Sequence, residues 1–170
     1  MRNSYWFAFL GFIVTCADAF TSAGALLPQN IDLPHELVAA VSRMYDASPS
    51  FRAQCGRIAG ASNAHVRVRF DIGVRPSCRA ITEITRRRGS VCADIRIPPG
   101  SASYAEILSH EFEHIIEQLE GLDLRTLSKV RNSGVHEVQR ELYETDRAQR
   151  AGRLVAEELR LTRSSQRSTD

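Results

Sequence analysis

Apolar and polar residues alternate along two segments in the middle of the chain, 64–72 and 91–97. In both, every second residue is alanine, valine, isoleucine or phenylalanine, and the residues between them are mostly charged or polar. This period of two is typical of a β-strand with one buried face. A third, less regular strand is expected over 79–85. The arginine-rich stretch 86–90 is expected to be a solvated hairpin tip rather than a basic patch.

Other segments have the three-to-four-residue spacing of an amphipathic helix. Helices are predicted over 34–46 and over 50–60, and a last long helix is expected over 134–160, after a loop over 122–133. A further helix, described below, precedes that loop. Together these elements predict an α+β domain with a small, mostly antiparallel sheet and a long C-terminal helix.

Residues 1–19 have the pattern of an export signal. A positive charge precedes an apolar stretch over 5–14, and Ala17 and Ala19 provide the small residues that a signal peptidase recognises. The apolar stretch is shorter than the roughly 20 residues of a transmembrane helix. We therefore expect a cleaved signal peptide and a secreted or periplasmic protein. A membrane anchor formed by 5–19 is the alternative.

The rest of the chain is expected to form one domain. The protein has 170 residues, of which 43% are hydrophobic and 25% charged, the balance of a folded soluble domain. We place this domain at 20–163 and a flexible polar tail at 164–170. A net charge of +2 is too small to imply a nucleic-acid partner. After signal cleavage no stable membrane association is expected.

Three cysteines lie beyond the signal: Cys55, Cys78 and Cys92. An exported compartment permits disulfides, so one bridge and one free thiol are allowed, and the sequence does not choose the pair. The cysteines lack the CxxC spacing of a zinc knuckle. We interpret them as structural.

The residues that point most directly to chemistry are His110, Glu111 and His114, which form an HExxH motif. On a helix, residues four apart lie one turn apart on the same face, so both imidazoles can reach one zinc ion at about 2.0–2.1 Å. Glu111 flanks the metal without competing as a ligand. Its carboxylate can take a proton from a water that the metal activates. The motif therefore predicts a zinc site with Glu111 as the catalytic base.

The motif helix is predicted over 103–120, since Ser103 and Glu106 have the spacing of a capping box. Glu117 lies one turn beyond His114 and could orient its imidazole. A solvated surface position is favoured for Glu117, because most glutamates are exposed. An apolar stripe opposite the histidines is expected to be buried; it consists of Leu108, Phe112, Ile115 and Leu119.

The motif resembles that of the zincin metallopeptidases, which are named for HExxH. The glycine and third histidine that metzincins carry after this motif are absent, so the chain looks most like the gluzincins, whose third ligand is a glutamate on a later helix. The resemblance covers about 101–121 and, more loosely, 137–152. It implies a single zinc ion. It also implies that 91–97 is the strand along which an extended peptide substrate lies.

A catalytic zinc needs three protein ligands and one open position. Glu137, Glu141 and Glu144 are the candidates in the last predicted helix. Glu144 is favoured because Ala148 and Gly152 follow it at one-turn intervals, and small residues there would let this helix approach the motif helix. Glutamate followed by small residues is also similar to the third-ligand segment of several gluzincins. Glu141 and Glu137 stay open as alternatives.

The sequence thus predicts a minimal zincin-like hydrolase that cleaves a peptide or protein substrate through a metal-activated water. His110, His114 and Glu144 would hold Zn²⁺, and Glu111 would act as the base. The alternative is an exported zinc-binding or interaction module with little or no turnover. Neither the cleavage specificity nor the oligomeric state can be read from the residues.

Overall fold

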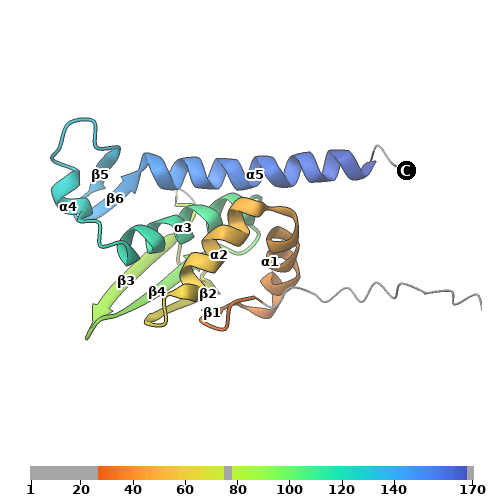
Figure 1. Cartoon of the computed structure of the whole chain (residues 1–170), viewed down its shortest axis with the longest axis horizontal. Helices are drawn as coiled ribbons and strands as arrows, with labels where there is room; N and C mark the ends of the chain where they lie inside the picture. The colour runs from red at the N-terminus through yellow and green to blue at the C-terminus, as the bar shows by residue number, and fades with distance from the viewer. Residues whose placement is uncertain (1–26, 75–77, 168–170) are drawn as a thin grey trace, which may run out of the picture.

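The computed structural model describes residues 27–74 and 78–167 (Figure 1). The signal peptide predicted over 1–19 lies outside these ranges. No helix in the described part of the chain is long and apolar enough to cross a membrane. In chain order the elements are β1 Ile31–Asp32, α1 His35–Ala47, α2 Pro49–Gly60, β2 Ala64–Phe70, β3 Ile81–Arg87, β4 Ser90–Ile97, α3 Tyr104–Leu119, α4 Leu124–Leu127, β5 Val135–Gln139, β6 Leu142–Thr145 and α5 Asp146–Arg167.

The α+β class is confirmed, but the prediction of a mostly antiparallel sheet is wrong. The main sheet has the strand order β1-β2-β4-β3, and two of its three pairings, β1 with β2 and β2 with β4, are parallel. Within this sheet only β3 and β4 pair antiparallel. The helices α1 and α2 form the crossover that a parallel β1–β2 pair requires. The chain then places β3 at the sheet edge, and β4 returns between β3 and β2.

A tight turn joins β3 to β4 at the predicted arginine-rich hairpin tip. Arg87 pairs with Ser90, leaving Arg88 and Gly89 as a two-residue loop. Their φ angles of 49° and 83° are both positive, as hairpin turns that match the strand twist require. The arginines here are exposed, so the expected solvated tip is confirmed.

The helices cover one face of the sheet, and α3 lies between the sheet and α5 (Figure 1). In β2, buried residues alternate with exposed ones, as the sequence pattern predicted. The expected apolar stripe of α3 is also confirmed: Leu108, Phe112 and Ile115 are fully buried and Leu119 is partly buried. Phe112 stacks on Phe51 of α2 with ring centroids 5.5 Å apart. This packing fixes α3 against the sheet and turns its histidine face toward α5.

The last helix begins 12 residues later than predicted, at Asp146 instead of 134. Residues 135–145 form an antiparallel hairpin of β5 and β6 instead of helix, and α5 begins only at Asp146. The hairpin turns at Glu141, whose φ is 60°. The hydroxyl of Thr145 accepts a hydrogen bond from the backbone N–H of Ala148 at 2.9 Å, which caps the helix. At its other end α5 continues to Arg167, into the segment predicted to be a flexible tail.

All three cysteines are free thiols, so the disulfide that the sequence allowed is not formed among them. Cys55 lies in the core on α2, where burial raises the pKa of its thiol to about 12. Cys92 lies on the exposed face of β4. The sheet and the core therefore separate these two side chains.

α5 packs tightly against α3 at Gly152, which confirms the prediction that small residues allow this contact. A Cβ atom at Gly152 would lie 2.7 Å from the backbone oxygen of Glu106 and 3.4 Å from the Cβ of His110. Ala148, one turn earlier, is fully buried. The absence of a side chain at 152 thus sets the distance between α5 and the motif helix.

Replacing Gly152 by alanine is expected to lower the free energy of unfolding by about 1–3 kcal/mol, because the backbone of α3 must move to accommodate the new methyl group. Gly56→Ala in α2 is the matched control: a Cβ there meets nothing within 4 Å. That change is expected to stabilise the protein by about 0.5–1 kcal/mol through helix propensity. Chemical denaturation measures both. Equal effects of the two substitutions would contradict the close approach at Gly152.

Candidate metal centre

His110 and His114 project from the same face of α3, one helical turn apart. Their Nε2 atoms lie 3.2 Å from each other, and both side chains are largely buried. The helix places them there because Leu108, Phe112 and Ile115 occupy the opposite, core-facing stripe. The spacing predicted from the motif is therefore present in the fold.

Glu144 completes a cluster with the two histidines, but from a different element than predicted. It lies near the end of β6, not on a helix. Its Oε2 is 3.3 Å from Nε2 of His110, and its Oε1 is 3.5 Å from Nε2 of His114. The backbone N–H of Thr145 donates to the same Oε1 at 2.8 Å. The hairpin therefore delivers the carboxylate to the histidines just before α5 begins.

The other two glutamates considered for this position do not reach the histidines. Glu137 and Glu141 are both exposed on the β5–β6 hairpin. Glu137 accepts a hydrogen bond at 3.2 Å from the backbone N–H of Glu141, across the hairpin turn. Their i, i+4 relation to one another would apply only on a helix, and this segment is not helical.

The three side chains have the separations of ligands around one small cation. One nitrogen or oxygen atom from each of His110, His114 and Glu144 lies within 4.8 Å of the other two, and the closest pairs are 3.2–3.5 Å apart. Ligand atoms about 2.0–2.1 Å from a tetrahedral zinc ion lie about 3.3 Å from one another. Two imidazoles and a carboxylate are also a ligand set that zinc accepts. The residues present fit a three-ligand zinc site.

The charges in this cluster are strongly coupled. Burial alone would lower the pKa of His114, but hydrogen bonds to Glu117 and Glu144 raise it to about 10. Burial alone would raise the pKa of Glu144, but hydrogen bonds from His110 and His114 hold it well below its usual range. The carboxylate of Glu144 therefore stays ionised, which is the form that binds a metal.

Glu117 is not the solvated surface residue that the sequence favoured; it is only 1% exposed. Its Oε2 lies 3.0 Å from Nδ1 of His114, and its Oε1 accepts a hydrogen bond from the Thr145 hydroxyl at 2.7 Å. A carboxylate on Nδ1 fixes the ring so that Nε2 faces Glu144. Because Thr145 directly follows Glu144, Glu117 links the position of one histidine to that of the third carboxylate.

Glu117→Gln is expected to weaken zinc binding about 10- to 100-fold, because an amide has only one acceptor oxygen for two donors and no charge to orient His114. A competition titration with a chromophoric chelator measures the affinity. Glu137→Gln is the matched control, because it removes the same charge from an exposed strand. Unchanged affinity in a folded Glu117→Gln protein would refute the orienting role.

Glu111 lies beside the histidines and is held by the edge of the sheet. It is 9% exposed, and its Oε2 accepts a hydrogen bond from the Thr82 hydroxyl of β3 at 2.6 Å. The resemblance implied that 91–97 is the strand along which an extended peptide lies, but β4 is an internal strand, between β2 and β3, and has no free edge for a peptide. The edge strand next to Glu111 is β3. The sequence could not show this, since strand order depends on the tertiary pairing.

A second set of polar contacts holds the start of α5 against α3. The Arg147 Nε donates to Oε1 of the buried Glu113 at 2.6 Å, and its Nη2 donates to Glu120 at 3.1 Å. Gln54 of α2 donates to the other Glu113 oxygen at 2.7 Å. These contacts fix α5, and with it Glu144, relative to the histidines. Sequence reasoning missed them because isolated charged residues carry no pairing signal.

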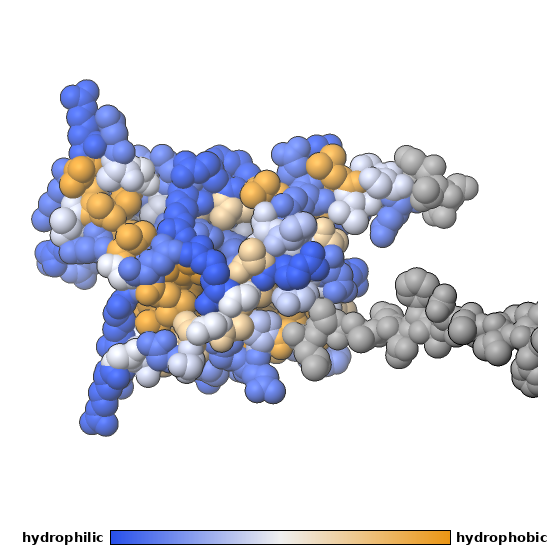
Figure 2. All heavy atoms as spheres, in the orientation of Figure 1, coloured by the Kyte–Doolittle hydropathy of each residue, from blue (hydrophilic) through white to orange (hydrophobic). Residues whose placement is uncertain are grey.

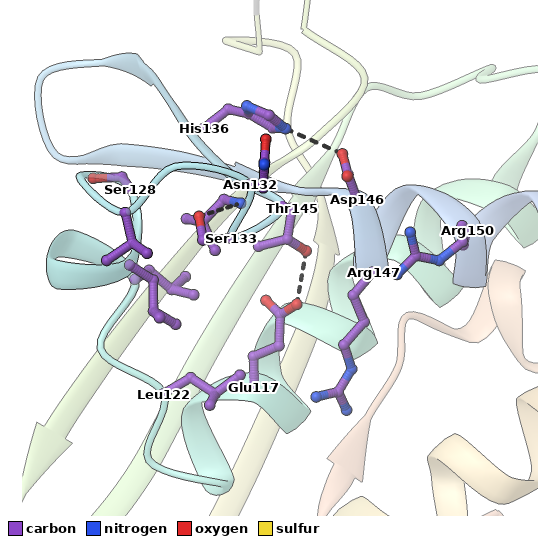
Figure 3. Close-up of a pocket in the computed structure, with 15 residues that line it drawn as sticks. Glu117, Leu122, Ser128, Asn132, Ser133, His136, Thr145, Asp146, Arg147 and Arg150 are labelled. Carbon is purple, nitrogen blue, oxygen red and sulfur yellow. Dashed lines mark hydrogen bonds and ion pairs between the residues drawn. The ribbon is translucent and has the colours of Figure 1, made fainter.

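Two cavities flank the cluster. One, of about 340 Å³, lies directly beside His110, Glu111 and Glu144. The other, of about 650 Å³, lies behind Glu117, between the loop that contains α4 and the start of α5. Figure 3 shows Glu117 pointing toward Thr145 in the wall of this cavity, while His136 points toward Asp146. Hydrophobic side chains also gather on the surface over this end of the molecule (Figure 2). Of these two cavities, only the first is lined by members of the cluster, His110 and Glu144, together with Glu111.

Comparison with known proteins gives no match: no family model, no curated protein and no solved structure is similar to this chain. The functional argument therefore depends on the motif and on the geometry around it.

Proposed function

We propose that this protein is a zinc-dependent metallopeptidase that hydrolyses peptide bonds. One observation carries the proposal: Glu144, from a separate element, lies 3.3–3.5 Å from the Nε2 atoms of both histidines of the HExxH motif. Two histidines four residues apart on a helix can occur by coincidence, so they alone are weak support for a metal site. A carboxylate brought to the same point, with a further carboxylate on Nδ1 of His114, is the arrangement of a zinc site with oriented ligands.

The open side of the cluster supports a catalytic role. A catalytic zinc keeps one position free for water or substrate, and the cavity of about 340 Å³ reaches His110, Glu111 and Glu144 from one side. When bound, the metal would act as a Lewis acid on the scissile carbonyl and lower the pKa of a nearby water. The rest of the chemistry falls to side chains of this chain.

Glu111 has the position required of the general base. As the water oxygen attacks the carbonyl carbon, a Glu111 oxygen accepts the water proton. It then passes this proton to the amide nitrogen as the C–N bond breaks, which yields a carboxylic acid and an amine. The Thr82 hydroxyl occupies Oε2 of Glu111 and leaves Oε1 for this proton. Thr82 is a positioning residue, and because it belongs to β3, it also places the base beside the outer edge of the sheet.

The metal content of the purified domain tests the proposal most directly. We expect one zinc ion per chain in the wild type and a loss of zinc in His110→Ala, measured by elemental analysis after dialysis. His136→Ala is the control, because His136 is exposed and pairs with Asp146 away from the cluster. No zinc in the wild type, even after zinc addition, would end the proposal.

The exported location and the peptide or protein partner belong to the same proposal. They are supported by the signal-like pattern of 1–19 and by the open cavity beside Glu111. The alternative of a binding module with little turnover is less well supported, because Glu111 has the hydrogen-bonded position of a base.

A further inference from the structure

The wall that α5 contributes to the cavity beside the ligands carries two polar side chains with unused bonding capacity. Gln149 and Arg153 line this cavity and lie four residues apart, on one face of the helix. Within 27–74 and 78–167, neither side chain makes a hydrogen bond or an ion pair. Gly152 lies next to Arg153 and against Glu106 and His110, so this part of α5 passes very close to the motif helix.

The remaining charges in the cavity are already engaged. Arg79 donates to Glu106 at 2.7 Å. Glu111 is held by Thr82, and Glu144 by the two histidines. Of the two arginines that line this cavity, Arg153 is therefore the one that makes no ion pair among the described residues. Its guanidinium is exposed and, within the described part of the chain, unpaired, so it is free to pair with a group on the substrate.

We propose that this cavity is a subsite that receives an acidic side chain of the peptide substrate, with Arg153 binding its carboxylate. A planar guanidinium donates two parallel hydrogen bonds to a carboxylate, and the amide of Gln149 adds a further donor. The cavity of about 340 Å³ has room for a glutamate or aspartate side chain. This inference depends on the proposed function, because the subsite has meaning only next to a metal that holds the scissile bond.

A pair of small probes tests the subsite without requiring turnover. N-acetyl-glutamyl hydroxamate and N-acetyl-glutaminyl hydroxamate carry the same metal-binding group and differ only in the charge of the side chain. Calorimetry with the zinc-loaded protein gives both dissociation constants. We expect the glutamyl probe to bind about three- to tenfold more tightly, the range for a charge-assisted contact in a partly open site.

Substitutions on α5 assign the preference to one residue. Arg153→Gln should abolish it and Arg153→Glu should reverse it. Arg150→Glu is the matched control: it makes the same change of charge on the same helix, but Arg150 lines the other cavity. It should leave the preference intact.

Three outcomes would count against the subsite. Equal affinities of the two probes in a zinc-binding wild type would overturn it and leave the proposed function standing. A preference that survives Arg153→Glu, or that Arg150→Glu also removes, would overturn the assignment to Arg153. If the protein takes up no zinc, the proposed function is contradicted, and the subsite, which depends on it, is contradicted as well.

Discussion

Glu111→Gln should lower the turnover number for peptide hydrolysis by a factor of about 10² to 10⁴ while one zinc ion stays bound. The amide is similar in size to the carboxylate and can still accept the hydrogen bond from Thr82. It cannot take a proton from water, and that transfer is worth about this factor in general base catalysis. Steady-state kinetics on a peptide substrate, with zinc content measured on the same samples, separates the two effects.

Two further variants serve as comparisons for Glu111→Gln. Glu137→Gln makes the same change on the exposed hairpin and should retain full activity. Thr82→Val removes the hydroxyl that donates to Glu111 at 2.6 Å and should give a smaller loss than Glu111→Gln. Full activity in Glu111→Gln would mean that another group is the base. Loss of zinc in that variant would mean that Glu111 is a ligand.

Glu144→Ala should weaken zinc binding by more than about a hundredfold. Removing a residue that only orients a metal ligand lowers metal affinity about 10- to 100-fold. Glu144 is expected to contact the zinc ion directly, because its carboxylate lies 3.3–3.5 Å from Nε2 of both histidines. Its side chain is 26% exposed, so its removal should leave the fold intact. Competition with a chelator of known affinity measures the change, and thermal unfolding of the metal-free variant checks the fold.

The other two glutamates of the hairpin are the controls for this experiment. Glu141→Ala and Glu137→Ala should bind zinc as tightly as the wild type, because both side chains are exposed at the hairpin and away from the histidines. If Glu144→Ala keeps its zinc while one of these loses it, the hairpin must shift its register on metal binding and the present cluster is not the site.

The sequence predicted most elements of the domain where the local pattern was strong. The alternation in 64–72 appears as β2, and the spacing of apolar residues around the HExxH motif appears as α3 with the expected buried stripe. These patterns are reliable because each face of a strand or helix has a fixed period along the chain. They fix which residues face inward, but not which strands pair.

The predictions that were wrong concern features that depend on contacts with residues far away in the sequence. Residues 135–145 pair as a hairpin although the carboxylates at 137, 141 and 144 suggested a helix face. Glu117 contacts both His114 and Thr145. The spacing along the helix indicated the contact with His114, but no local pattern indicates the one with Thr145, which comes from a distant strand. The reason for favouring Glu144 was partly correct. Small residues at 148 and 152 do allow α5 to approach α3, but Glu144 lies in β6, before the helix begins.

The sequence by itself determined that the two histidines and the glutamate of the motif lie close together, because all three are within one turn of the same helix. It also determined the face of α3 on which they lie. Only the tertiary structure decided the third carboxylate, the orientation of His114 by Glu117, and the placing of Glu111 beside β3. Each of these depends on a contact between residues 28 to 34 positions apart; for Glu117 this is the hydrogen bond from Thr145, which holds the carboxylate in place. Such contacts exist only after the β5–β6 hairpin and the sheet pack on the motif helix.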